Sequence, residues 1–147
     1  MATARRWSAR TVGTAAAAWI PGILLALIFV PAGLAKFRDD SGWARAFAHW
    51  GFPVWFRVLI GVLEVGAAAL VLVPHRLVPR AAPLGAAIVI AVMLGGMATH
   101  VVRDGGRHLT SEVVPIVLAS LLLWARRAEW LGARPLSRPR AAMSART

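Results

Sequence analysis

Residues 58–74 read VLIGVLEVGAAALVLVP and carry one charged side chain, Glu64, near their middle. A carboxylate at the centre of a bilayer costs about 3 kcal/mol, so it needs neighbouring protein, a wet cavity or a proton. Gly61 and Ala68 share the face of Glu64 at helical spacing, and such small residues let another helix come close. The stretch therefore predicts a helix bundle gathered around Glu64. This residue either exchanges protons or binds a ligand, or it serves as a structural hydrogen-bond partner to a facing helix.

The composition of the 147-residue chain is typical of a membrane protein, with 59% hydrophobic residues and a mean hydropathy of +0.66. The absence of cysteine excludes disulfides, thiol chemistry and cysteine-ligated zinc or iron–sulfur sites. The net charge is +11, but the arginines lie between and beyond apolar stretches, where membrane topology explains them better than nucleic-acid binding. We therefore predict one membrane domain and no nucleic-acid partner.

Four stretches with little charge are long enough to cross a bilayer, at about 20 residues per crossing. The predicted spans are residues 14–35, 54–73, 82–102 and 109–125. Residues 1–13 would form a basic cytoplasmic N-terminus, residues 14–126 the membrane domain, and residues 127–147 a basic, disordered cytoplasmic tail. The predicted fold is an all-α integral membrane protein, a bundle of four transmembrane helices with a short interfacial helix between the first two.

The short helix is predicted from the polar and aromatic connection between the first two spans. Asp40 or Ser41 can cap it, and Trp43, Phe47 and Trp50 would then form one stripe along it. This stripe suits a helix that lies in the headgroup region of the membrane. An ordinary packed loop helix explains the stripe equally well.

The positive-inside rule sets the orientation of the predicted spans. With both termini in the cytoplasm, eleven Lys and Arg residues lie on the cytoplasmic side and six on the outer side. We therefore predict a multi-pass protein with cytoplasmic N- and C-termini.

This orientation places polar side chains from all four spans near the outer side. Glu64 would lie about 15 Å deeper, at a rise of ~1.5 Å per residue. The sequence thus predicts an outward-facing polar mouth in which Glu64 and His100 are candidate catalytic groups. The candidate ligand-binding residues around them are Lys36, Arg57, His108 and Glu112.

Several of these residues have a structural alternative. Lys36 can extend toward the headgroups, and Glu112, in the first turn of a helix, can complement the helix dipole. Haem would need facing axial ligands at one depth, and His100 has no clear partner in the sequence. Zinc could bind side chains of the types found at His100, His108 and Glu112. We nevertheless predict no metal site and no resident cofactor.

Four motifs recur in the order and spacing of a known family. Together they resemble the DoxX family of small bacterial membrane proteins over about residues 20–125. The resemblance implies a four-helix bundle in a bacterial plasma membrane, and the recurrent Lys, Glu and His of the family match Lys36, Glu64 and His100. The motifs are GLAKF (33–37), WGFP (50–53), GVLEVGAAAL (61–70) and MLGGMATH (93–100).

The resemblance also implies an accessory or quinone-interacting subunit of a membrane oxidoreductase system, with quinone as a substrate. In this hypothesis Glu64 and His100 exchange protons with the quinone, Lys36 holds an anionic form, and the electrons come from another protein.

Two alternatives remain open. The chain could be a non-enzymatic assembly factor or chaperone for membrane or exported proteins. It could also be a small membrane enzyme that uses Glu64 and His100 as an acid–base pair on a lipophilic substrate. The sequence is thus compatible with an enzyme and with a non-enzyme. Its expected partners are the lipid bilayer, another protein of a membrane complex, or a second copy of the chain.

Overall fold

The computed structural model describes residues 9–106 and 109–127, with side chains from residue 19 onward. These residues form five helices and contain no strand. The helices are α1 (Ala9–Ala35), α2 (Gly42–His49), α3 (Val54–Val71), α4 (Ala81–Asp104) and α5 (Thr110–Ala125). The helices predicted for the four spans are confirmed, although α1 begins at Ala9 rather than at residue 14. Most of the predicted tail (127–147) lies outside the described residues.

The long helices carry apolar side chains on their outer surfaces. By length and composition, α3 and α4 are each able to cross a membrane, while α5 and the Trp19–Ala35 part of α1 are shorter apolar helices. Leu27, Val62, Leu94 and Val114, one from each long helix, are all more than half exposed. A water-soluble protein rarely exposes large apolar side chains on every helix. The surface therefore fits a membrane protein.

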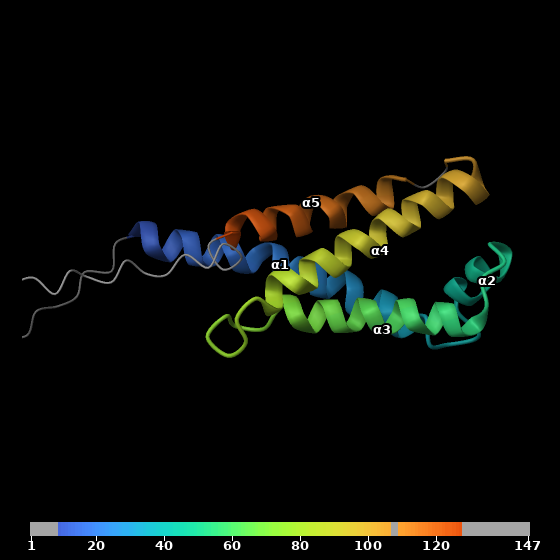
Figure 1. Ribbon diagram of the computed structural model, residues 1–147, viewed down its shortest axis with the longest axis horizontal. Helices are drawn as coiled ribbons and strands as arrows, with labels where there is room; N and C mark the ends of the chain where they lie inside the picture. Colours follow the sequence, from blue (N-terminus) through green and yellow to red (C-terminus); the bar gives the residue numbers. More distant parts are fainter. Residues whose placement is uncertain (1–8, 107–108, 128–147) are drawn as a thin grey trace, which may run out of the picture.

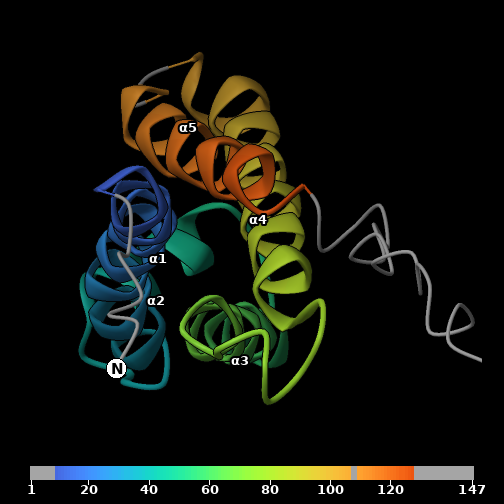
Figure 2. The same cartoon turned by 90° about the vertical axis from the view of Figure 1, so that its left-hand side faces the viewer.

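The four long helices form a closed ring. Helix α1 packs against α3 and α5, and α4 packs against the same two helices on the other side (Figure 2). Helices α3 and α4 lie close together where residues 72–80 connect them, and they diverge toward the end that holds α2 (Figure 1). The bundle therefore has a closed end at the α3–α4 connection and an open end at α2.

Small residues bring the helices close together toward the closed end. A Cβ atom on Gly85 of α4 would lie 2.8 Å from the carbonyl oxygen of Ala67, and one on Gly22 of α1 would lie 3.2 Å from that of Val71. Such close contacts are how helices associate in lipid, where burial of apolar surface gives no advantage. The core that they enclose consists of Leu25, Ala26, Phe29, Ala67, Ala68, Val71, Ala86, Val89, Met93, Ala119 and Leu122.

Helix α2 lies across the open end. Ser41 is its N-cap, since the Ser41 hydroxyl accepts a hydrogen bond from the Ala44 N–H at 3.1 Å. Phe47 and Trp50 are buried, and the Phe47 ring lies 6.2 Å from the ring of Phe56 on α3. The aromatic stripe therefore faces the bundle, as in the alternative of a packed loop helix.

Candidate functional site

Two glycines bring the first pair of candidate residues together. A Cβ atom on Gly33 would lie 3.0 Å from the carbonyl oxygen of Gly61, and one on Gly61 would lie 2.9 Å from that of Gly33. Helices α1 and α3 therefore touch through their backbones at this level. Lys36 and Glu64 each follow one of these glycines by three residues, which places them on the same side of their helices. The Lys36 Nζ atom donates to Glu64 Oε2 at 2.7 Å.

Lys36 is enclosed by three elements of the fold. Its side chain is only 2% exposed, and that of Glu64 only 4%. Besides binding Glu64, the ammonium group lies 3.4 Å from the Ala32 carbonyl oxygen and 3.7 Å from the centre of the Trp43 ring. The ring faces attract a cation, so α2 contributes to holding the charge. Lys36 therefore does not extend to the headgroups, the simpler alternative for this residue.

His100 belongs to a second polar group at the same end. Its Nδ1 atom lies 2.7 Å from Asp104 Oδ2, one helical turn further along α4. The Trp50 indole N–H donates to both carboxylate oxygens of Asp104, at 3.1 and 3.2 Å. The Trp50 and His100 rings meet edge to face, with their centres 5.1 Å apart. His100 therefore has a carboxylate and an indole ring as neighbours, and neither is an axial ligand that haem would need on a facing helix.

Glu112 connects this second group to the first. Its Oε1 atom lies 3.5 Å from His100 Nε2, and its carboxyl group packs against Gly96, where a Cβ atom would lie 3.4 Å from Glu112 Cδ. Glu112 is also within electrostatic range of Lys36 and Glu64. It does lie in the first turn of α5, as a dipole-complementing residue would, but it is buried against α4.

Two cavities adjoin these groups, with volumes of about 1140 and about 350 Å³. They share a wall, so both are bounded by the same acids, imidazole and indole rings. The shared residues are Trp43, Trp50, Glu64, Met93, His100 and Glu112. The ionisable side chains of the site can therefore be reached from two directions.

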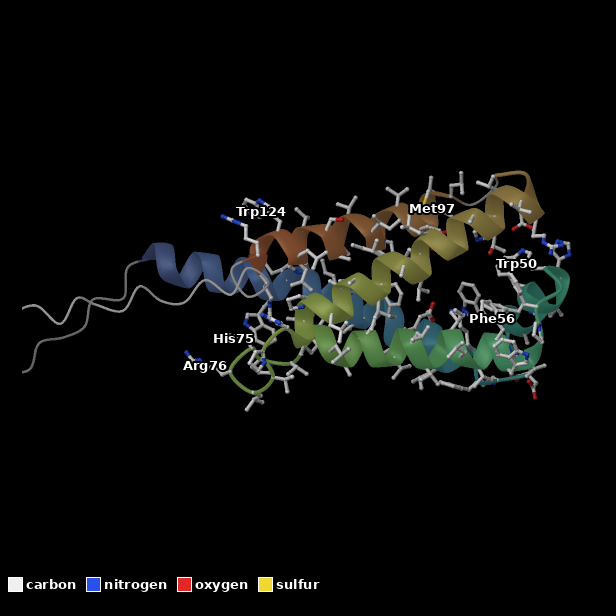
Figure 3. The ribbon with its side chains drawn as sticks, viewed as in Figure 1. Trp50, Phe56, His75, Arg76, Met97 and Trp124 are labelled. Atoms are coloured by element: carbon white, nitrogen blue, oxygen red, sulfur yellow. The ribbon has the colours of Figure 1, made fainter. Side chains whose placement is uncertain are left out.

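The two cavities differ in the rest of their linings. The larger one reaches polar residues at the α2 end, including Ser41, Arg45, His49, Arg103 and Asp104. The smaller one lies between α3 and α4 and is lined mainly by aromatic and aliphatic side chains, such as Phe47, Phe52, Phe56, Ile60, Leu63 and Val92. Figure 3 shows Trp50 and Phe56 in the space between the diverging helices, far from Trp124 at the closed end.

Arg57 and His108 are not part of this arrangement as described. Arg57 lines neither cavity; it donates to the Arg38 carbonyl oxygen at 3.0 Å and to the Asp39 carboxylate. Its buried Nε atom has no hydrogen-bond partner among the residues that the structure describes. The structure thus places Arg57 where it fastens the α1–α2 loop to α3, away from the other candidates. His108 lies outside the described residues.

An exposed ion pair in the same loop contrasts with the buried one. Arg38 donates to both carboxylate oxygens of Asp40, at 3.0 and 2.8 Å. These hydrogen bonds, and then the positive charge of Arg38, lower the pKa of Asp40 below its usual value. Both side chains are exposed, so the pair contributes little to stability.

Sequence reasoning missed Asp104 and Trp50, although Asp104 follows His100 at the spacing of one helical turn. Within residues 9–106 and 109–127, no group of three or more His, Asp or Glu side chains is arranged to hold a metal ion. The zinc ligand set considered from the sequence, His100, His108 and Glu112, is not tested by the structure, because His108 lies outside the described residues.

Comparison with known proteins identifies the family. The sequence model of the DoxX-like family matches residues 20–125, a region that contains most of α1 and all of α2 to α5. No curated protein and no solved structure matches the chain. Because the family match covers more than half of the 147 residues, the chain belongs to the DoxX-like family.

Proposed function

We propose that this chain is a multi-pass membrane protein that binds the head group of a quinone as an accessory subunit of a membrane oxidoreductase system. The observation that carries the proposal is that Glu64 and His100 line the same two cavities, beside the buried ammonium of Lys36. Pockets for small ligands are typically 300–1000 Å³, largely apolar, with a few polar groups. The smaller cavity, about 350 Å³, has this character.

Membership of the DoxX-like family and the exposed apolar side chains on all four long helices support four membrane spans. Charge supports the orientation in which the α2 end faces outward, because the positive-inside rule places both termini in the cytoplasm. In this arrangement the gap between α3 and α4 faces the lipid. An isoprenoid tail would then remain in the hydrocarbon while the head group occupies the smaller cavity.

The residues around the cavity suit both forms of a quinone. The carbonyl oxygens of the oxidised ring accept hydrogen bonds, which His100 and Lys36 can donate. The hydroxyl groups of the reduced ring release protons, which the imidazole of His100 and the carboxylate of Glu112 can accept. Trp43 and Trp50 supply flat apolar surfaces beside them. In this proposal the chain binds the quinone and exchanges its protons, and a partner protein supplies the electrons.

Tryptophan fluorescence tests the proposal, because Trp43 and Trp50 line the cavity. A short-chain quinone is titrated into the protein in lipid nanodiscs. We expect saturable quenching in the wild type and about tenfold weaker binding in His100→Gln, the loss of one hydrogen bond to a polar ligand. His75→Gln, an exposed change at the closed end (Figure 3), is the matched control and should bind as the wild type does. Quenching that never saturates, or equal affinity in His100→Gln, would contradict the proposal.

A small membrane enzyme is the second candidate. An acid–base pair must share a cavity, and Glu64 and His100 share both. This candidate predicts that the purified chain converts a lipophilic substrate without a partner. The quinone proposal predicts instead that the chain alone transfers no electrons. An assembly factor would show a third pattern, in which partner abundance follows the stability of the bundle and is insensitive to His100.

A further inference from the structure

A continuous line of titratable side chains leads from the polar mouth of the larger cavity to the wall that the two cavities share. It begins at the polar mouth with Asp104 and His49, whose Nε2 atom lies 3.7 Å from Asp104 Oδ1. It continues through His100 to Glu112, and both of these residues line the smaller, apolar cavity as well as the larger one. The line therefore leads from the mouth of the larger cavity to the smaller cavity.

We infer that Asp104, His100 and Glu112 form a proton path from the polar mouth to the apolar cavity, with Asp104 as the positioning residue for His100. The inference rests on the proposed function only for the identity of the ligand that uses the proton. The path itself is defined by contacts among residues of this chain.

Asp104 acts as a hydrogen-bond acceptor in this arrangement. The Trp50 indole nitrogen is a donor only, and it donates to both oxygens of the Asp104 carboxylate. With Asp104 accepting, the Nδ1–H of His100 donates to Oδ2 at 2.7 Å. The neutral imidazole then has its lone pair on Nε2, the nitrogen that faces Glu112. Asp104 thus directs the working nitrogen of His100 toward the cavity.

The transfer step moves one proton without changing the charge of the group. An imidazolium gives the proton on Nε2 to Glu112 Oε1, keeps its Nδ1–H on Asp104, and becomes neutral; Glu112 becomes a carboxylic acid. The two atoms are 3.5 Å apart, so transfer requires a small rotation of the carboxyl group or one bridging water. Gly96 leaves space for that rotation, because it has no side chain against Glu112.

Among the residues that the structure describes, His100 is the titratable group in ion-pair contact with Glu112. Lys36, from the end of α1, binds Glu64 of α3 at 2.7 Å, so its charge offsets that of Glu64. On α5 itself, the Ser111 hydroxyl lies 3.5 Å from Glu112 Oε1. Further charges line the larger cavity toward the mouth, at Arg45, Arg103 and Asp104. A buried carboxylate without a counter-charge is costly, so Glu112 either faces an imidazolium or holds the proton itself.

Chemical labelling of carboxyl groups tests the path without any ligand. Dicyclohexylcarbodiimide is lipophilic and reacts with protonated carboxyl groups. The protein in nanodiscs is labelled across about pH 5 to 9, where histidine changes charge, and labelled peptides are measured by mass spectrometry. We expect labelling of Glu112 that decreases as the pH rises, and little labelling of Glu64, which is paired with Lys36. Failure to label Glu112 at any pH would overturn the inference.

Asp104→Asn tests the role of Asp104. Without this carboxylate the imidazolium form of His100 is less stable. The proton that His100 and Glu112 share then lies more often on Glu112. We expect the midpoint of Glu112 labelling to rise by about one pH unit. Asp40→Asn, which removes an exposed carboxylate from the α1–α2 loop, should leave the midpoint unchanged. If Asp104 acted on Glu112 only through its negative charge, removal of that charge would lower the midpoint of Glu112 labelling. A lower or unchanged midpoint therefore overturns the inference.

A His100 variant distinguishes a proton path through His100 from an electrostatic effect of Asp104 on Glu112. In a His100→Gln background, Asp104→Asn should no longer raise the midpoint, because the residue that shared the proton is absent. A rise that persists in that background would contradict the path. If Asp104→Asn does not assemble, Trp50→Phe tests the same link with the opposite sign, since Asp104 then holds the His100 proton more strongly and the midpoint falls. A negative quinone titration would leave these results standing, so the two proposals fail separately.

Discussion

The two ends of the bundle differ in packing and in polarity, although the same four helices form both. Toward the closed end, small residues such as Gly85 and Ala67 let the backbones touch, and the core is apolar. At the open end α3 and α4 diverge, while α1 and α3 stay in contact through Gly33 and Gly61. The polar side chains of Lys36, Glu64 and His100 lie at this end. Close contact at the closed end fixes α3 and α4 there, so the other end can remain open and polar. Among the described residues, most of the buried charged side chains lie at the end where α3 and α4 diverge.

Removal of one charge at the open end should have the largest effect on stability. Lys36→Met leaves Glu64 buried without its counter-charge, at a cost of about 3–5 kcal/mol in the free energy of unfolding. The double variant Lys36→Met/Glu64→Gln should recover most of this loss, because the unpaired charge is gone. Denaturation with a mixed-detergent titration measures both.

Arg38→Met is the control for that prediction, because it removes an exposed cation from a solvent-screened pair that contributes little to stability. If Lys36→Met proved as stable as Arg38→Met, the buried pair would not hold the open end together.

Two glycines on α4 test how tightly this helix packs at two positions, and the expected effects on stability are smaller than at Lys36. Gly85→Ala places a methyl group 2.8 Å from the Ala67 carbonyl oxygen, and we expect a loss of about 1–3 kcal/mol. Gly95→Ala meets no atom within 4 Å, so the gain in helix propensity, up to about 1 kcal/mol, should dominate. The same denaturation experiment applies. Equal effects at the two positions would mean that α4 packs no more tightly at Gly85 than at Gly95.

Much of the fold could be predicted from the sequence, because apolar length and charge placement are local signals. The helices at the four spans and the Ser41 cap were of this kind. That Glu64 needs partners also followed from its position in an apolar stretch. That all four long helices cross a bilayer stays a prediction.

The arrangement of the site depended on contacts that no local pattern contains. Lys36 meets Glu64 because Gly33 and Gly61 touch across two helices, and the sequence shows only that each glycine is present. Arg57 lies at the predicted end of the bundle, yet it turns to the loop carbonyl of Arg38. Depth along a helix could be predicted from residue number, whereas the direction of a side chain around the helix required its neighbours.

One neighbour of His100 could be predicted from the sequence, and the other could not. Asp104, one helical turn after His100, was available as a local signal. Trp50 lies 54 residues before Asp104 and reaches it because α2 folds across the open end. The aromatic stripe of α2 had two interpretations of equal merit, and its burial against the bundle distinguishes them.

The difference between the two ends can be measured directly on one helix. The chain contains no cysteine, so Met93→Cys and Val89→Cys each introduce a unique thiol on the same face of α4, one turn apart. Both belong to the apolar core, but Met93 is 8% exposed and lines both cavities, whereas Val89 is 1% exposed and lines neither. We predict that a small methanethiosulfonate reagent modifies the cysteine at position 93 readily and leaves the cysteine at position 89 unmodified. Equal reactivity at both positions, or none at position 93, would contradict an open, polar cavity at the α2 end.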